Sequence, residues 1–174
     1  MATIAIVGIV ASVAVPSFKY IGTTNRMSSE ANALLGDMQF ARVEAIREGQ
    51  QVSICEADAT ESSCQAGGAG WAGGWIVFSD PNNTGQPGGA AGSILRAQKP
   101  LSAINNGADT FTGPVAIVAF NRDGFASGLT VAATMFTLHD AAGDAQFTRC
   151  LALNPTGYLA VVRQGITVGA TTCT

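Results

Sequence analysis

The first 48 residues of the chain contain no strong helix breaker except Pro16, and this long uninterrupted segment constrains the fold more than any other feature. Apolar residues recur at helical spacing in its second half, while charged residues mostly occupy the other faces. Gly49 follows at the position of a helix C-cap. We therefore predict a helix over residues 3–48 that is kinked, and not ended, at Pro16. The apolar stripe consists of Ala31, Leu34, Leu35, Met38, Ala41 and Ala45.

Periodicity alone is equally typical of a core helix in a globular domain, but the length of this segment is not. A helix of about 45 residues would extend roughly 70 Å, too far for a compact domain in a chain of 174 residues. We expect its first half to project into a membrane or into a bundle of similar helices. The apolar run from Ala2 to Val15 is shorter than the roughly 20 residues that span a bilayer. No Lys or Arg precedes the run, so it also makes a poor signal peptide.

After Gly49 the sequence changes to short segments rich in β-branched and aromatic residues, separated by clusters of Asp, Asn, Pro and Gly that are typical of turns. This pattern predicts an α+β protein in which a long N-terminal α-helix packs on a C-terminal antiparallel β-sheet or sandwich head. We divide the chain into the helix (1–49), with a projecting part (1–22) and an amphipathic half (23–49), and the head (50–174). The expected strands are residues 51–55, 75–79, 93–98, 115–120, 135–140, 148–153 and 158–164.

The four cysteines favour two disulfides. Cys55 and Cys64 flank a short acidic loop, Cys150 lies in an expected strand, and Cys173 is the penultimate residue. An even number of cysteines in this arrangement is typical of an oxidising compartment. Cys55–Cys64 and Cys150–Cys173 are the favoured pairs, although four cysteines permit three connectivities. No two cysteines have a short metal-ligand spacing and the chain has one histidine, so we expect no metal site.

Few residues suggest catalysis or ligand binding. His139 is the single histidine and is followed by Asp140 at an expected strand end, and no G-x-S-x-G nucleophile motif is present. Trp71 and Trp75 are more typical of a core edge than of a ligand-binding platform. The Gly-rich segments 65–74 and 82–93 lack the Lys and Ser/Thr of a phosphate-binding loop, and we expect flexible surface loops there. We expect no enzyme activity and no cofactor.

Several segments in order along the chain resemble one family. They are "TIAIVGIVASVAVPSF", "NRMSSEANALLGDMQFARVEAIREGQQVSIC", "GWIVFSD", "VAFNRDGFAS" and "NPTGYLAV". Together they are similar to the type IV pilin-like proteins, specifically the FimT/FimU minor pilins and the GspH-type pseudopilins of type II secretion. The resemblance covers essentially the whole chain.

The resemblance implies a structural subunit that is held in the inner membrane by a single helix, with its head in the periplasm, before it joins a pilus or pseudopilus. Its implied partners are other minor and major pilins, and its implied role is to help initiate pilus assembly at or near the tip. Family members carry a leader and then Phe-Thr-Leu-Ile-Glu-Leu, so we expect the frame upstream of Met1 to encode these. Close helix approach is expected at small residues such as Gly8, Ala11 and Ala14. The implied membrane and helix-packing residues are Ile4, Ile6, Val7, Gly8, Ile9, Val10, Ala11, Val13, Ala14, Val15 and Pro16.

Three alternatives stay open at this point. A GspH-type pseudopilin of a type II secretion system is one, although the paired cysteines and the "GWIVFSD" segment favour the pilus type. DNA binding for natural transformation is another: some FimT proteins use a Gly-Arg-x-Arg motif, whereas positions 157–160 here read Gly-Tyr-Leu-Ala. A basic patch would then have to come from Arg149, Arg163 and Arg122, in a chain whose net charge is −3. The third alternative is a secreted β-domain that binds carbohydrate or protein through its Gly-rich loops.

Overall fold

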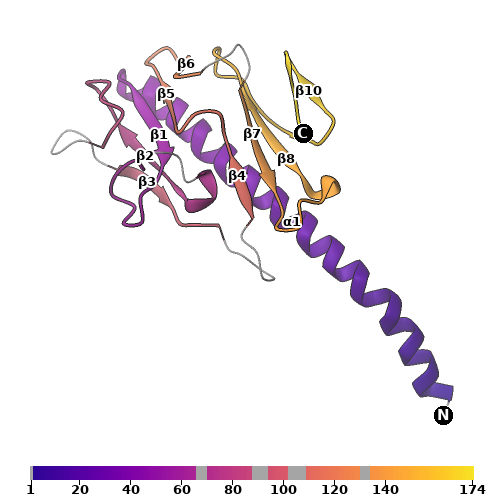
Figure 1. Ribbon diagram of the computed structural model, residues 1–174. Coiled ribbons are helices and arrows are strands. Elements are labelled where there is room, and N and C mark those ends of the chain that lie inside the picture. The colour runs from indigo at the N-terminus through magenta and orange to yellow at the C-terminus, as the bar shows by residue number, and fades with distance from the viewer. Residues whose placement is uncertain (1, 66–69, 88–93, 102–108, 130–133) are drawn as a thin grey trace.

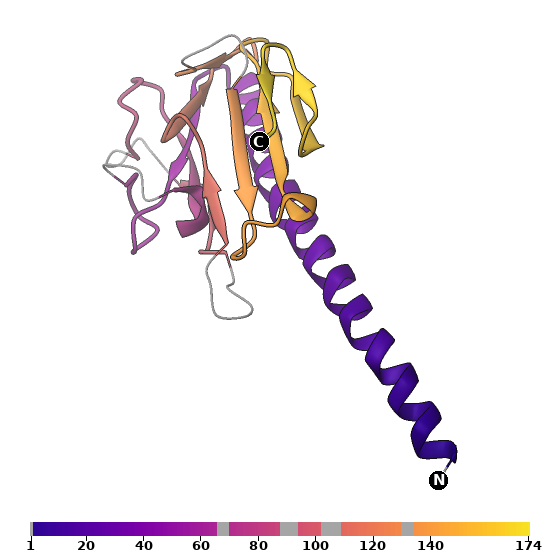
Figure 2. The same ribbon diagram turned by 45° about the vertical axis from the view of Figure 1, so that its right-hand side comes forward.

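A single long helix projects from a β-rich head in the computed structural model, which describes residues 2–65, 70–87, 94–101, 109–129 and 134–174, with helix side chains described from residue 17 onward (Figures 1 and 2). Helix α1 spans Ala2–Glu48, and 47 residues at 1.5 Å each correspond to about 70 Å. It continues through Pro16, so the proline does not end it; the expected kink stays a prediction. The helix ends where the sequence predicts, because Gly49 adopts a φ of 68° and its N–H donates to the carbonyl of Ala45 at 3.0 Å.

The described head contains two antiparallel sheets and a small hairpin, which confirms the expected fold class. One sheet has the strand order β3-β2-β1-β5-β6, the other has β4-β7-β8-β9, and β10 pairs with β11. All seven predicted segments form strands, of which the third is described from residue 94. The sequence did not indicate β4, β6, β10 and β11, whose two or three residues are too short for a periodic pattern. The strands are β1 (Val52–Glu56), β2 (Trp75–Ser79), β3 (Ile94–Gln98), β4 (Thr110–Thr112), β5 (Ile117–Phe120), β6 (Ala126–Ser127), β7 (Thr134–His139), β8 (Arg149–Leu153), β9 (Leu159–Arg163), β10 (Thr167–Val168) and β11 (Thr171–Thr172).

The main core lies between α1 and the inner faces of both sheets. The strands alternate, so that Val52 and Ile54 of β1 contribute to this core while Cys55 contributes to a separate apolar cluster. Two tryptophans belong to the core: Trp71, in the short helix η1 (Trp71–Gly73), and Trp75 are both fully buried. Because of this burial, neither forms an exposed ligand-binding platform. The helix residues without any exposed surface are Met27, Ala31, Leu34, Met38, Ala41 and Ala45.

Each sheet also carries a small apolar cluster beside a disulfide. The disulfide Cys55–Cys64 lies in the cluster of the first sheet, which includes Ile76 and Phe78. The disulfide Cys150–Cys173 lies in the cluster of the second sheet and ties the segment that follows the β10–β11 hairpin to β8. These are the two pairs that the sequence favoured. A cross-link at the penultimate residue holds a chain end that would otherwise fray.

Candidate assembly surface on the first helix

The outward face of α1 within the head carries no charge. Between residues 22 and 43, the exposed positions follow one another at alternating intervals of three and four residues. This is the spacing of a single face of a helix that packs along another helix. We call these seven residues the outward face; they are Gly22, Asn25, Ser29, Asn32, Gly36, Gln39 and Val43.

The charged residues in the same part of α1 lie beside this face and contact the head. Arg26 forms an ion pair with Asp109, with 3.1 Å between nitrogen and oxygen. Arg42 donates to the carbonyl of Gly157 at 3.0 Å. The charges of the helix are therefore used to attach the head, and they leave the outward face neutral.

Asp37 is the most central of these charged contacts. Its carboxylate accepts a hydrogen bond of 2.9 Å from the indole Nε1 of the buried Trp75. It also pairs with Arg96 of β3 at 3.0 Å, and the Arg96 guanidinium lies over the ring of Phe40, 3.7 Å from the centroid. These contacts tie the edge strand β3 to the helix and direct the Asp37 charge toward the sheet.

Like an ordinary surface helix, α1 buries its apolar face, but its exposed side lacks the charges that such helices usually carry there. Neutral residues on an exposed helix face suit contact with another protein, because a buried unpaired charge would be costly. Small side chains such as Gly22, Ser29 and Gly36 permit a close approach of two helices. The outward face is visible in the sequence, because its neutral residues recur at the same three- and four-residue intervals as the apolar stripe. The apolar stripe alone does not identify this second face.

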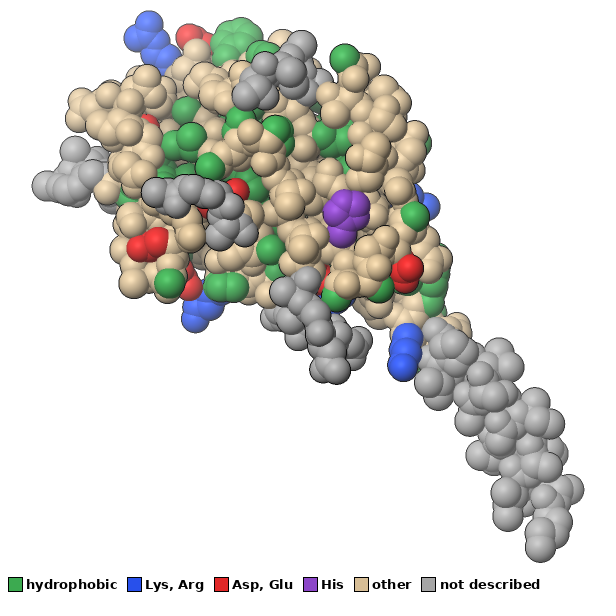
Figure 3. All heavy atoms as spheres, viewed as in Figure 1, with side chains coloured by type: hydrophobic (Ala, Val, Ile, Leu, Met, Phe, Trp, Pro, Cys, Tyr) green, Lys and Arg blue, Asp and Glu red, His purple; other side chains and the backbone are tan. Residues whose placement is uncertain are grey.

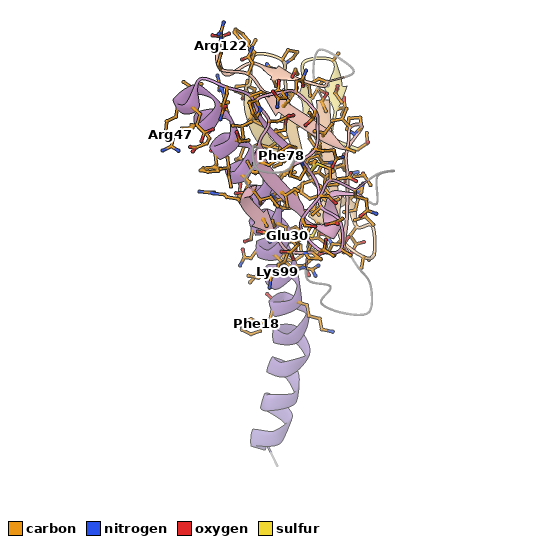
Figure 4. All side chains as sticks on the ribbon, turned by 90° about the vertical axis from the view of Figure 1, so that its left-hand side faces the viewer. Phe18, Glu30, Arg47, Phe78, Lys99 and Arg122 are labelled. Atoms are coloured by element: carbon orange, nitrogen blue, oxygen red, sulfur yellow. A yellow bond between two sulfur atoms is a disulfide. The ribbon has the colours of Figure 1, made fainter. Side chains whose placement is uncertain are left out.

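Large exposed apolar side chains lie at both ends of the outward face. At the base of the head, Phe18 is 74% exposed, and Figure 4 shows it on the projecting part of α1. Tyr20 is half exposed and lies against the ring of Phe147, with 5.4 Å between the centroids. At the other end, Val43 and Ile46 are 61% and 51% exposed. The neutral face is thus continuous with apolar surface along the helix.

The predicted membrane and helix-packing residues, from Ile4 to Pro16, lie outside the described side chains, although their backbone is helical. Their packing role stays a prediction. Within the described residues, no helical segment combines the length and the apolar character that crossing a membrane requires.

The three arginines that a DNA-binding patch would need do not form one exposed cluster. Arg149 is only 5% exposed and donates to the carbonyls of Thr148 and Gln146 and to the Ser28 hydroxyl of α1. Burial lowers the pKa of the Arg149 guanidinium from its usual value, and the charge of Arg163 lowers it further. A buried arginine that binds backbone carbonyls has little surface to offer a ligand, so the alternative of DNA binding cannot rely on Arg149.

Arg163 lies in β9 of the second sheet, whereas Arg122 lies in the turn between β5 and β6 of the first sheet, beside the opposite end of the second sheet. Arg163 of β9 pairs with Arg149, the first residue of β8. Leu153, the last residue of β8, lies about 13 Å further along that strand. The turn that follows Leu153 contacts the turn that contains Arg122, since Ala126 donates to the carbonyl of Pro155. Figure 4 places Arg122 at the end of the head opposite the projecting helix, and the Lys and Arg side chains visible in Figure 3 are scattered.

The remaining candidate residues do not assemble into a reactive site. His139 contacts the Thr148 hydroxyl at 3.1 Å through Nδ1, and it pairs with Thr110 across β7 and β4. In the described part of the chain, no group of three or more His, Cys, Asp or Glu side chains could hold a metal ion. The Gly-rich segments fall partly outside the described residues, at 66–69 and 88–93.

Comparison with known proteins adds a family and a fold. Residues 30–157 match the family model described as Type II transport protein GspH. Two crystal forms of the type IV minor pilin FimU from Pseudomonas aeruginosa (strain PAO1) resemble the chain. The first has a TM-score of 0.59 at 21% identity, covering 79% of this chain and 89% of FimU. The second has a TM-score of 0.54 at 20% identity, covering 78% and 91%. No curated protein sequence matches the chain significantly.

Proposed function

Since the chain belongs to the GspH family, which comprises minor pilins and pseudopilins, we propose that it is a minor pilin of a type IV pilus and helps to initiate pilus assembly at or near the tip. The choice of a pilus is supported by the likeness in fold to the minor pilin FimU. Such a protein acts as a structural subunit, and its chemistry is that of helix packing.

The observation that carries this proposal is the neutral outward face of α1. A helix of about 70 Å extends far beyond the head, and its exposed side within the head lacks the charges of a solvated surface. In a fibre, this face would lie against the helices of neighbouring subunits. The partners we propose are therefore other minor and major pilins that present helices of the same kind.

We also propose a separate role for each of three segments of the chain. Residues 1–22 would anchor the subunit in the inner membrane and later enter the fibre core, residues 23–49 would join helix and head, and residues 50–174 would form the periplasmic head. The anchor uses the apolar side chains between Ile4 and Pro16. The two disulfides support an oxidising compartment for the head.

A second candidate is a pseudopilin of a type II secretion system. The description of the matching family, Type II transport protein GspH, favours it. The same outward face would then pack in a short periplasmic pseudopilus. The two candidates share the assembly surface and differ in the fibre that it builds.

Deletion of the gene tests the choice between these candidates. We expect surface pili sheared from the deletion strain to fall strongly, and the gene with its natural upstream sequence to restore them. Normal piliation with a loss of exported type II substrates would support the pseudopilin instead. If neither pili nor secretion changes, the proposed function is wrong.

Complementation with charged variants tests the assembly surface itself. Asn32→Arg places a charge on the outward face, where it should lower fibre yield strongly because the charge would have to be buried between helices. Asn82→Arg adds the same charge at an exposed loop position of the head and should restore piliation. Both purified variants should unfold like the wild type. Equal fibre yield from both variants would exclude the outward face as a packing surface.

A further inference from the structure

Two carboxyl groups meet where α1 leaves the head. Glu30 lies on α1 close to Met27, and Asp109 lies immediately before β4. The Asp109 side chain has no exposed surface, and Glu30 is partly buried. Figure 4 shows Glu30 at the base of the head, above Phe18 on the projecting helix. The two groups thus lie between α1 and the second sheet, close to the point where the helix leaves the head.

The hydrogen bonds account for one oxygen of Asp109. Its Oδ1 accepts from Arg26 and from the backbone N–H of Ala141, each at 3.1 Å. Its Oδ2 is buried, as is Oε2 of Glu30, and neither oxygen has a donor among the described residues. A buried acceptor without a donor is costly, and the side chains of Glu30 and Asp109 are hydrogen-bonded to each other, so one of the two carboxyl groups must carry a proton.

The electrostatic surroundings decide which group carries the proton. Arg26 pairs directly with Asp109 and so favours its ionised form. Burial raises the pKa of Glu30 to about 7, and the charge of Asp109 and a side-chain hydrogen bond to Asp109 raise it too, against a smaller opposing effect of Arg26. Glu30 is therefore the donor and Asp109 the acceptor.

We propose that Glu30 and Asp109 share one proton that fastens the base of the head to α1, and that loss of this proton at higher pH loosens the junction. The proton passes between the carboxyl group of Glu30 and water, and no other bond changes. A groove of about 330 Å³ beside α1, lined by Glu30, Ser29, Gln98 and Leu101, brings solvent to the Glu30 side of the pair.

Other charged and titratable groups surround the pair. Arg26 faces it from α1, and Lys99 lies between Gln98 and Pro100, which line the same groove as Glu30. Asp140 adjoins Ala141, whose N–H binds Asp109, and His139 pairs with Thr110 beside Asp109. A divalent cation is a less suitable occupant than a proton, because Arg26 already supplies the positive charge at Asp109.

The sign of the pH effect follows from the raised pKa. In the unfolded chain Glu30 loses its proton near its ordinary value of 4.5, and in the folded chain only near 7. The folded state therefore binds the proton more tightly, and the stability that this proton provides is lost as pH rises through about 7. Stability should fall between pH 5.5 and 8.5.

Thermal unfolding of the full chain in detergent, followed by circular dichroism, tests the proposal. We expect the wild-type Tm to fall by about 4 °C from pH 5.5 to 8.5, since a chain of this size shifts by roughly 2–4 °C per kcal/mol. Glu30→Gln supplies an amide donor to Asp109 at every pH, so its Tm should not show this fall and should exceed that of the wild type at pH 8.5. His139 is retained in all variants.

Glu48→Gln is the matched control, because it makes the same change at the other end of α1, where the Glu48 carboxylate contacts Arg47 and Gln50 and lies far from Asp109. It should keep the wild-type slope. Amide hydrogen exchange locates the effect: residues 27–34 should exchange faster at pH 8.5 in the wild type than in Glu30→Gln, after correction for intrinsic rates. The proposal is overturned if Glu30→Gln keeps the wild-type slope, or if it is less stable than the wild type at every pH.

Discussion

The two faces of α1 use charge in opposite ways. The side that meets the sheets has a fully buried apolar stripe flanked by Arg26, Asp37 and Arg42, each with a partner in the head. The outward face is exposed yet neutral along its whole length in the head. A helix that needed only to hold a solvated head would place its charges outward. The charged flanks are therefore used within the subunit, and the neutral outward face suits the proposed contact with a neighbouring helix.

Removing apolar volume from the inward side should produce the largest effect. Leu34 has no exposed surface and lies in the core shared by α1 and both sheets. Leu34→Ala should lower the free energy of unfolding by about 2–5 kcal/mol, because it loses buried surface and leaves a cavity. Gln39→Ala, on the outward face, should change it by less than about 0.5 kcal/mol. Urea unfolding in detergent measures both losses. Equal losses would contradict the conclusion that the inward side, and not the outward face, stabilises the subunit.

The features that were predicted correctly from the sequence depend on local patterns. The helix, its end at Gly49 and seven strands follow from local periodicity and turn residues, which act over a few positions. The ion pair of Arg26 with Asp109 and the contact of Arg149 with Ser28 join residues 83 and 121 positions apart, and the sheet order also depends on pairing between strands that are not consecutive in the sequence. A single arginine in a strand has the same local pattern whether it is exposed or buried. Only the packing of η3 (Ala145–Phe147) and α1 around Arg149 determines which of the two occurs.

The charged residues beside the apolar stripe should contribute less to the free energy of unfolding than the stripe does. We expect most of the contribution of Asp37 to come from its hydrogen bond with Trp75. Asp37→Ala leaves the buried indole N–H of Trp75 without its acceptor, which should cost about 1–3 kcal/mol in the free energy of unfolding. Asp37→Asn keeps an oxygen for Trp75 and removes the charge that pairs with the half-exposed Arg96. That change should cost less than about 1 kcal/mol. Urea unfolding distinguishes the two, and equal costs would show that the ion pair, not the indole bond, holds Asp37.

Gly36→Ala on the outward face should have the smallest effect on stability. It should stabilise the subunit slightly but reduce fibre assembly. A Cβ added at Gly36 meets nothing within 4 Å in the subunit, so Gly36→Ala gains helix propensity without a clash. The free energy of unfolding should rise by about 0.5–1 kcal/mol. In a fibre, the added methyl group would separate two closely packed helices, so the yield of sheared fibres should fall although the subunit is more stable. Urea unfolding and fibre yield from the same variant measure both quantities. A more stable subunit with unchanged fibre yield would mean that no neighbour packs closely at Gly36, and the outward face would then have to be neutral for another reason.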